Sequence, residues 1–173
     1  MAHEEMILDI KKLVCDYIHE HIGGFIEDET RDVRNARVKL DDGAQKPTRA
    51  HATDAGLDLY TRESKTIKAH GSETFDTGVH VELPQNTYGK IASKSGLNVN
   101  HSVVSCGGTI DQGYTGSIKV KLYNLGDEDY TFKCGEKIAQ LVIQPCLFCD
   151  VEVVDEINKE TDRRDCGFGS TGK

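Results

Sequence analysis

The chain has 173 residues and a formal net charge of −8, with 29 Asp and Glu against 21 Lys and Arg. This length favours one sizeable hydrophobic core with an appendage, because a second full domain would leave both halves marginal. The negative charge argues against nucleic acid and anionic membrane surfaces as partners, so a polyanionic ligand would need a local cationic pocket.

The first 35 residues form an acidic extension, with nine Asp and Glu against four Lys and Arg. Over residues 6–25 the apolar side chains recur every three or four positions, which predicts one face of an amphipathic helix. Gly23 and Gly24 supply a terminator, and EDETRD after them is a polar connector. The apolar face would pack on its own domain or, as an alternative, bind a partner protein.

The sequence predicts no membrane segment. Its opening, MAHEEMILDIKK, is acidic where a secretory signal is basic, and no apolar run approaches the length that spans a bilayer. We therefore expect a soluble, cytoplasmic protein, in which the six cysteines are reduced thiols. Cys146 and Cys149 fall in an apparent strand, where side chains three positions apart point to opposite faces, which disfavours a zinc site.

Over residues 36–160 the periodicity changes to two, and Gly, Asn, Asp or Pro closes each short run. Many short strands separated by turns predict a β-sandwich, jelly roll or barrel rather than a parallel α/β sheet. The predicted strands include residues 79–83, 88–92, 118–122, 138–143 and 151–154. Residues 161–173 are rich in glycine and poor in apolar side chains, which indicates a flexible C-terminal arm.

Five short segments place polar residues beside glycine and interrupt this pattern. In chain order they are Ala55-Gly56-Leu57-Asp58-Leu59, Ser93-Lys94-Ser95-Gly96-Leu97, residues 108–116 (GTIDQGYTG), residues 135–141 (GEKIAQL) and residues 163–172 (RRDCGFGSTG). Singly, each is typical of a turn, a loop or a terminus. Together and in this order, they closely resemble the five motifs of the trimeric dUTPase family, over residues 38–172.

The resemblance implies an all-β fold, a jelly roll or distorted β-barrel, with the helix of residues 6–25 added in front. It implies hydrolysis of dUTP to dUMP and pyrophosphate with Mg²⁺, a reaction of nucleotide metabolism that keeps uracil out of DNA. It also implies a homotrimer with shared active sites, in which one subunit gives the first, second and fourth motifs, another the third, and the last its arm.

Hydrolysis of a phosphoanhydride needs an activated water, donors for the phosphate oxygens and a metal. By the resemblance, Asp111 is the general base that activates the water attacking the α-phosphorus. Ser95 contacts the oxygen that bridges the α- and β-phosphates. Gln140 holds a phosphate oxygen or the catalytic water.

Lys94 and Gly96 also belong to the predicted phosphate site, and Asp58 is expected near the water shell of the metal, as an indirect contact. Lysine stands at positions 94 and 137, where the family more often has arginine. The charge is kept and the bidentate fork is lost. Lys137 is assigned to subunit packing or ion pairing rather than to the substrate.

The turn at residues 105–110, including Gly108, Thr109 and Ile110, would present main-chain amides and carbonyls to uracil. Cytosine would leave such buried groups unpaired and would be rejected. Tyr114 would lie under the deoxyribose and leave no room for a 2′-hydroxyl.

The C-terminal arm would close over the bound substrate. Arg163 would pair with the γ-phosphate and Phe168 would stack on uracil. The main-chain amides offered to the terminal phosphate are those of Gly169, Ser170 and Thr171. Arg164 is an alternative to Arg163, because Arg164 and Asp165 stand where the family commonly has glycine.

Two other interpretations stay open. The related dCTP deaminases share the fold, but they typically carry an arginine-serine-serine segment and a catalytic glutamate, where this chain has Lys94-Ser95-Gly96 and Asp111. A regulatory protein would instead keep the dUTPase scaffold and bind a partner through the helix of residues 6–25. The intact Asp111, Ser95, Gln140 and Phe168 favour hydrolysis in either case.

Overall fold

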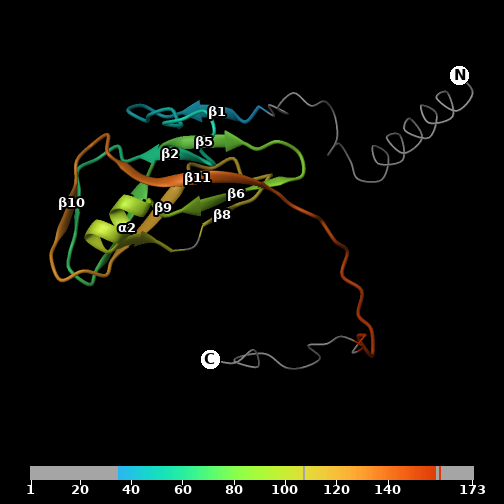
Figure 1. Ribbon diagram of the computed structural model, residues 1–173. Helices are drawn as coiled ribbons and strands as arrows, with labels where there is room; N and C mark the ends of the chain where they lie inside the picture. The colour runs from blue at the N-terminus through green and yellow to red at the C-terminus, as the bar shows by residue number, and fades with distance from the viewer. Residues whose placement is uncertain (1–34, 107, 159, 161–173) are drawn as a thin grey trace, which may run out of the picture.

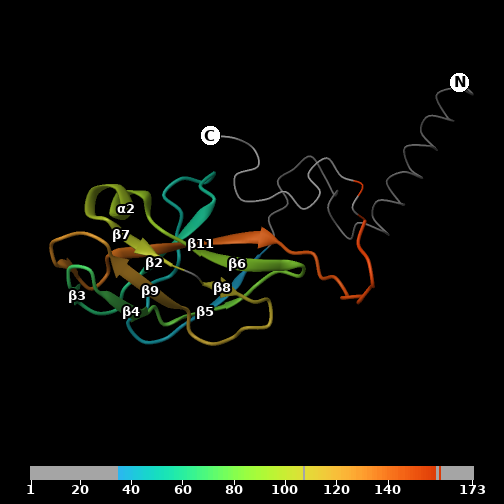
Figure 2. The same ribbon diagram turned by 90° about the horizontal axis from the view of Figure 1, so that it is seen from below.

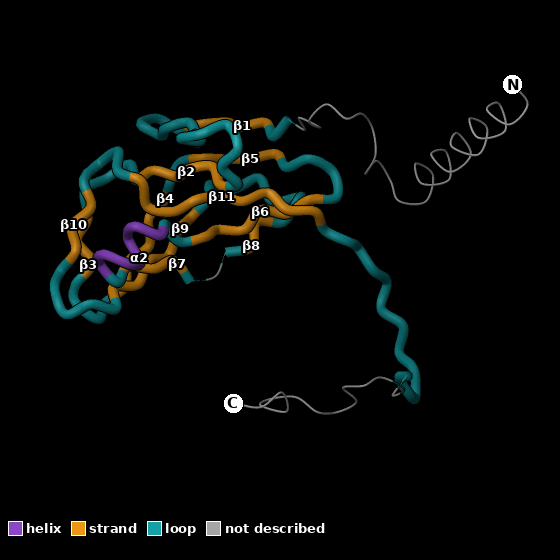
Figure 3. Tube along the Cα trace, in the orientation of Figure 1, coloured by secondary structure: helices purple, strands orange, loops and turns teal. Residues whose placement is uncertain are grey.

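The structure, a computed structural model, describes residues 35–106, 108–158 and 160 (Figure 1). Within them the chain forms short strands and one short helix, α2 (Figure 3). The strands are β1 (Arg37–Leu40), β2 (Gly56–Tyr60), β3 (Lys65–Ile67), β4 (Ser72–Asp76), β5 (Val79–Glu82), β6 (Thr87–Ala92), β7 (Val103–Ser105), β8 (Thr109–Ile110), β9 (Lys119–Asn124), β10 (Tyr130–Phe132) and β11 (Lys137–Pro145). The predicted helix of residues 6–25 and the arm of residues 161–173 lie outside the described residues.

The strands pair antiparallel in four sheets. The largest has the order β2-β11-β6-β8, a second has the order β4-β9-β7, and β1-β5 and β10-β3 are two-stranded. The predicted all-β class is confirmed. The edge strands of these sheets are not hydrogen-bonded to one another, so the described residues form open sheets and no closed barrel.

Alternating side chains from the sheets build one core. On β9, Val120 and Leu122 are buried at every second position, as the period of two predicts. Phe75 of β4 and Phe132 of β10 meet edge to face, with ring centroids 5.4 Å apart. Each such fully buried side chain contributes roughly 1.5–3 kcal/mol of transfer free energy. The core therefore fixes the sheets on which the site stands.

One irregularity in β11 decides which of its side chains share a face. Lys137 pairs with Tyr60 of β2 and Ala139 pairs with Leu59, so Ile138 is an extra residue in β11. Ile138 and Ala139 are consequently both buried. In a regular strand, residues 137 and 140 would point to opposite faces. Across the bulge, both lie on the face of β2 that carries Asp58.

One helix was not predicted, and the strand predicted for residues 151–154 is absent. The segment after Ala92 forms α2 (Ser95–His101), a helix that the sequence did not reveal because it is short and has no buried residue. Residues 151–154 form no strand, and β11 ends at Pro145, before Cys146 and Cys149. Beyond β11 the described chain runs away from the sheets in both views, where no strand of the same chain is available as a partner (Figures 1 and 2).

Candidate active site

Asp58 is the centre of a charged cluster on the four-stranded sheet. Its Oδ1 lies 2.5 Å from Nζ of Lys94, which follows β6, and its Oδ2 lies 2.7 Å from Nζ of Lys137 on β11. The Asp58 side chain is only 6% exposed, whereas both lysines keep contact with solvent. The first, second and fourth motifs therefore meet at one carboxylate, and Lys137 makes an ion pair, one of its two expected roles.

The two lysines keep Asp58 ionised. Burial favours the protonated carboxyl, but hydrogen bonds and charge from Lys137 and Lys94 outweigh it, and the pKa of Asp58 is lowered. The hydrogen bond to Asp58 in turn raises the pKa of Lys137. This arrangement holds two cations at one point of a chain whose net charge is −8.

Gln140 lies directly beside this cluster. It pairs in register with Asp58 of β2 and with Ala92 of β6. Its Nε2 donates a 3.0 Å hydrogen bond to the carbonyl oxygen of Ser93. A Cβ added at Gly56 would collide with the Gln140 side chain, so the first motif needs glycine there to admit the glutamine.

The remaining second-motif residues stand at the edge of this cluster. Lys94 is the N-cap of α2 and has an extended backbone, and Ser95 and Gly96 are the first helical residues. Ser95 and Gly96 are exposed, and a Cβ at Gly96 would meet nothing within 4 Å. Ser95 is thus open to solvent and follows directly in the chain after Lys94.

A pocket of about 530 Å³ opens between β6 and the segment that leads into β8. Gly108 and Thr109, both predicted to meet the base, line it together with Tyr88, Lys90, Ile91, Ala92, Ser93, Ser105 and Cys106. Gly108 has φ +107°, and a Cβ there would lie 2.9 Å from Ile91. Its carbonyl oxygen already accepts a 2.9 Å hydrogen bond from Ile91 N. Close approach to β6 therefore requires glycine at 108.

Asp111 and Tyr114 lie on the connection from β8 to β9. The amide of Tyr114 donates a 3.0 Å hydrogen bond to the carbonyl oxygen of Asp111, which closes a tight turn. The carboxylate of Asp111 is exposed, and Tyr114 is 41% exposed. The hydroxyl of Tyr114 donates to the carbonyl oxygen of Ser117, 3.0 Å away. The predicted base therefore sits on a short, internally bonded turn.

Asp111 and the charged cluster around Asp58 and Lys94 lie toward opposite ends of β6. Ile110 pairs with Gly89 near the start of β6, whereas Lys94 and Ser95 follow its end. Asp111 is thus nearest to residue 88, and the six residue steps from there to Lys94, four of them within β6, span up to ~20 Å at ~3.3 Å each. One chain does not bring Asp111 to Ser95.

Ser93 was given no role in the predicted site, whereas Ser105 begins the turn of residues 105–110 that was predicted to meet the base. The Ser105 amide donates to Ser93 Oγ at 2.9 Å, and both residues line the pocket. Through its carbonyl oxygen, Ser93 also holds Gln140. The sequence did contain a signal for Ser93, because it is the first residue of the second motif, but no role was assigned to it.

In the described part of the chain, no three His, Cys, Asp or Glu residues gather as metal ligands. Asp58 has both carboxylate oxygens engaged by lysines. Of the predicted site residues, the structure brings together Asp58, Lys94 and Gln140, and Ser95 and Gly96 follow Lys94 in the chain. Gly108 and Thr109 line the pocket, and Ile110, Asp111 and Tyr114 follow them in the chain. Arg163, Phe168, Gly169, Ser170 and Thr171 lie outside the described residues.

Known proteins resemble this chain over the residues that form the sheets and the site. A family model for dUTPase matches residues 42–172. The chain is 47% identical over 136 residues to a deoxyuridine 5′-triphosphate nucleotidohydrolase of Clostridium acetobutylicum, with 78% of this chain and 93% of the relative covered. A protein of the same name from Candida albicans is 41% identical over 128 residues, with 73% and 80% covered.

Solved structures of dUTPases have a fold similar to that of this chain. The dUTPase of Staphylococcus bacteriophage 80alpha, solved with dUpNHpp, is 29% identical with a TM-score of 0.75, and the match covers 80% of this chain and 99% of that one. A mutant dUTPase from phage phi11 of S. aureus, described as coordinating a structural Mg(II) ion, is 27% identical with a TM-score of 0.67, with 71% and 98% covered.

The sheet order, the two clusters of motif residues and these matches define a class of proteins, the all-β nucleotide hydrolases of dUTPase type. The chain belongs to the dUTPase family. It is accordingly an enzyme of nucleotide metabolism.

Proposed function

We propose that this enzyme hydrolyses dUTP to dUMP and pyrophosphate in the cytoplasm, by attack of a water on the α-phosphorus. The observation that carries the proposal is the cluster around Asp58, which holds Lys94 and Lys137 beside the exposed Ser95. A polyanionic triphosphate approaching a chain of net charge −8 needs such a local cationic site. The relatives named above are deoxyuridine triphosphate hydrolases.

In this mechanism the two clusters have different tasks. Asp111, exposed on its turn, accepts the proton of the attacking water as a general base. Lys94 meets the phosphate oxygens, and the hydroxyl of Ser95 donates to the oxygen that leaves the α-phosphorus. Gln140, held by Ser93, orients a phosphate oxygen or the water. The geometry thus separates base catalysis from leaving-group stabilisation.

Magnesium fits this site only as a companion of the triphosphate. Mg²⁺ commonly binds through substrate phosphates and keeps several waters. The ion would neutralise phosphate charge, while Asp58, engaged by two lysines, would touch its water shell at most. The residues at hand therefore fit a metal that arrives with the substrate.

Selection of the base is assigned to the pocket at Gly108 and Thr109. Its walls are close to the main chain of β6 and of the segment before β8, so amide and carbonyl groups are available to a pyrimidine edge. Such groups discriminate strongly, because a wrong base leaves them unpaired. Tyr114 would exclude ribonucleotides by filling the space of a 2′-hydroxyl.

We further propose a homotrimer with shared active sites. The ~20 Å along β6 between Asp111 and Lys94 means that a second copy must supply one of them. The described chain beyond β11 also carries apolar side chains without a core to enter: Leu147, Phe148, Val151, Val153 and Ile157 are exposed, Val153 at 94%. Exposed apolar surface on this scale is typical of an interface. Burial on a neighbouring copy would satisfy both observations.

The experiment measures pyrophosphate release from dUTP, dCTP, dTTP and UTP, with and without Mg²⁺. We expect turnover of dUTP alone, dependent on metal, and a loss of kcat of about a thousandfold in Asp111→Asn because the general base is gone. The control is Asp127→Asn, which changes a carboxylate with a 95% exposed side chain and should keep full activity. Ammonia release from dCTP would favour a deaminase, and equal turnover of all four nucleotides would contradict the proposal.

A further inference from the structure

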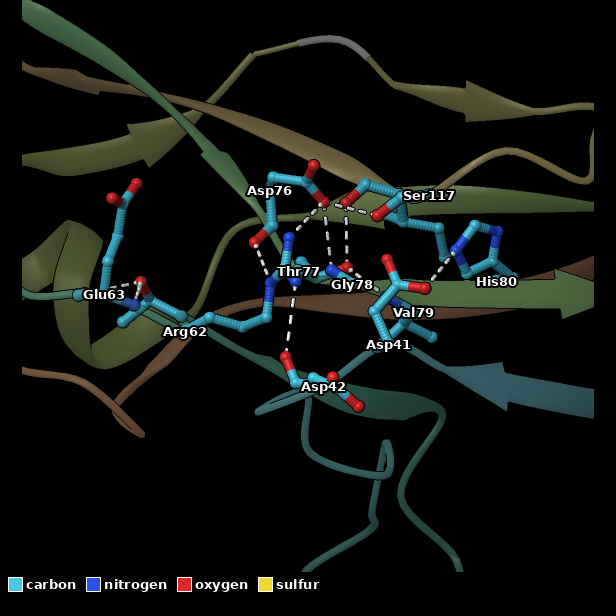
Figure 4. Close-up of polar contacts among 12 residues, drawn as sticks. Asp41, Asp42, Arg62, Glu63, Asp76, Thr77, Gly78, Val79, His80 and Ser117 are labelled. Carbon is cyan, nitrogen blue, oxygen red and sulfur yellow. Dashed lines mark hydrogen bonds and ion pairs between the residues drawn. The ribbon is translucent and has the colours of Figure 1, made fainter.

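The connection from β8 to β9, which carries Asp111, is held to the domain by hydrogen bonds that include one from the amide of Asn86 to Oε1 of Gln112, at 2.9 Å, and two contacts to β4 and β5. The carbonyl oxygen of Thr115 lies 2.8 Å from Nδ1 of His80 on β5. The hydroxyl of Ser117 donates a short hydrogen bond to Oδ1 of Asp76 at the end of β4. Figure 4 shows Ser117, Asp76 and His80 side by side around the turn between β4 and β5. These two hydrogen bonds therefore hold the connection to one part of the fold, the two strands β4 and β5 that flank a short turn.

The ring of His80 has an acceptor at each nitrogen. Nδ1 faces the carbonyl oxygen of Thr115, and Nε2 faces Oδ1 of Asp41 at 3.1 Å, in the loop after β1. A carbonyl oxygen and a carboxylate can only accept, so each ring nitrogen must donate for both bonds to form. Only the doubly protonated imidazolium does this. The geometry therefore calls for a cation at His80.

The surrounding charges favour that cation on balance. The hydrogen bond to Thr115, followed by the hydrogen bond and charge of Asp41, raises the pKa of His80, against some burial and the charge of Lys39. Lys39 of β1 stands opposite His80 in register. The other charged side chains beside it, Arg37 of β1 and Glu82 of β5, pair with each other at 2.5 Å.

The hydrogen bond between Ser117 and Asp76 does not respond to pH near neutrality. Its largest contact, the hydrogen bond from Ser117, lowers the pKa of Asp76, and so do the amide of Gly78 and the charge of Arg62. The Arg62 guanidinium lies 3.3 Å from Asp76 Oδ1. Asp76 is therefore ionised throughout the range in which a histidine titrates. Of the two groups, only His80, which contacts the carbonyl oxygen of Thr115, changes its protonation in that pH range.

We propose that His80 is a positioning residue for the hydrolysis, whose imidazolium bridges Asp41 and the Thr115 carbonyl and so holds the turn that presents Asp111. His80 itself touches no substrate. The inference rests on the proposed role of Asp111 as general base. Three residues lie between Asp111 and Thr115, and Tyr114 is the direct neighbour of Thr115, so release of this carbonyl loosens the side of the turn that the Asn86–Gln112 hydrogen bond does not hold. A displacement of about 1 Å at a catalytic group can lower the rate by about a hundredfold.

The sign of the pH effect follows from the raised pKa. The His80 bridge is complete at low pH and is lost as the pH rises through the pKa of His80 in the folded enzyme. A neutral ring keeps one hydrogen bond and turns a lone pair toward the other acceptor. We therefore expect kcat to fall on the alkaline side through a group with a histidine-like titration, in addition to any limb that Asp111 causes at acid pH.

The test compares pH profiles of kcat for wild type and three variants. His80→Gln should lose about tenfold in kcat at neutral pH and should lack the alkaline limb, because no ring remains to titrate. Asp41→Asn should shift that limb to lower pH, and Lys39→Gln should shift it to higher pH. The matched control is His70→Asn, which removes a histidine paired only with the exposed Asp127 and should leave the profile unchanged.

A readout independent of turnover keeps the two proposals apart. The ring protons of His80, followed by NMR against pH, should titrate above the ordinary histidine range in wild type and in Asp111→Asn, and lower in Asp41→Asn. An ordinary titration, or a His80→Gln enzyme with the wild-type kcat and alkaline limb, would overturn the positioning role. An active Asp111→Asn enzyme with a raised His80 titration would instead overturn the role given to Asp111.

Discussion

The two halves of the site are held in different ways. Around Asp58 the side chains themselves make the structure, through ion pairs to Lys94 and Lys137 and the register of Gln140. Around Asp111 the side chain is free in solvent, and hydrogen bonds to main-chain groups hold the turn that carries it. The half proposed to bind phosphate is thus assembled by charge, and the half proposed to activate water is held by hydrogen bonds to main-chain groups.

This difference indicates how each half will respond to change. A charge cluster is sensitive to the removal of one partner, since the others are left uncompensated. An anchored turn is sensitive to the loss of its fastening, even when the catalytic carboxylate is intact. Because the halves stand at opposite ends of β6, each can be damaged separately, and three experiments use this separation.

The largest effect is expected from combining two damaged halves. Ser95→Ala and Asp111→Asn chains should each form nearly inactive trimers, whereas trimers assembled from an equal mixture should recover about a quarter of wild-type activity, the fraction of sites that receive both intact groups. The assay is dUTP turnover after co-refolding, compared with the unmixed variants. No recovery would mean that one chain supplies both groups and that the halves are not shared.

A smaller effect is expected from Asp58→Asn, which removes the charge between the two lysines. We expect the free energy of unfolding at neutral pH to fall by about 1–3 kcal/mol. Because the pKa of Asp58 is lowered in the folded chain, its stabilisation is present above the ordinary carboxyl range and is lost as pH falls through the lowered pKa. The variant should therefore lose less stability on acidification than wild type in denaturant titrations. A wild-type acid dependence would refute this account of the cluster.

The smallest effect is expected from Lys94→Arg, which keeps the charge and adds a bidentate fork. We expect KM for dUTP to fall by about twofold to threefold with kcat almost unchanged, since a planar guanidinium orients phosphate better than an ammonium group. Steady-state kinetics would measure this, with the exposed Lys46→Arg as the control. A rise in KM would show that the pocket is fitted to lysine through its ion pair with Asp58.

The sequence predicted the all-β class and the strands with strict alternation, such as the one around Val120 and Leu122. It also identified the motif residues that the structure gathers around Asp58, because their types and order carry the family pattern. The short helix α2 was missed, since seven residues without a buried face leave no periodicity to detect. Residues 151–154 were misassigned because alternating apolar side chains do not make a strand by themselves, and among the described residues no strand pairs with this segment.

The contacts of His80 could not have been predicted, because they join a strand residue, His80, to residues 41 and 115 on two loops that are distant in the sequence. Ion pairing was one of the two roles predicted for Lys137, but its partner, Asp58, was not predicted. A spacing of three from Gln140 places residue 137 on the wrong face of a regular strand, and only the extra residue at Ile138 corrects this. Local rules of periodicity fail where a strand departs from its regular repeat.

That extra residue has a consequence for how the protein can change. Removing one residue between Lys137 and Gln140 would restore regular pairing. Either the side chain of Lys137 or the side chains of the residues after it would then point to the other face of the sheet. Many substitutions along this strand would be tolerated, whereas its length is fixed to the residue. Natural variants and engineered libraries should accordingly show diversity in side chains here and almost no insertions or deletions.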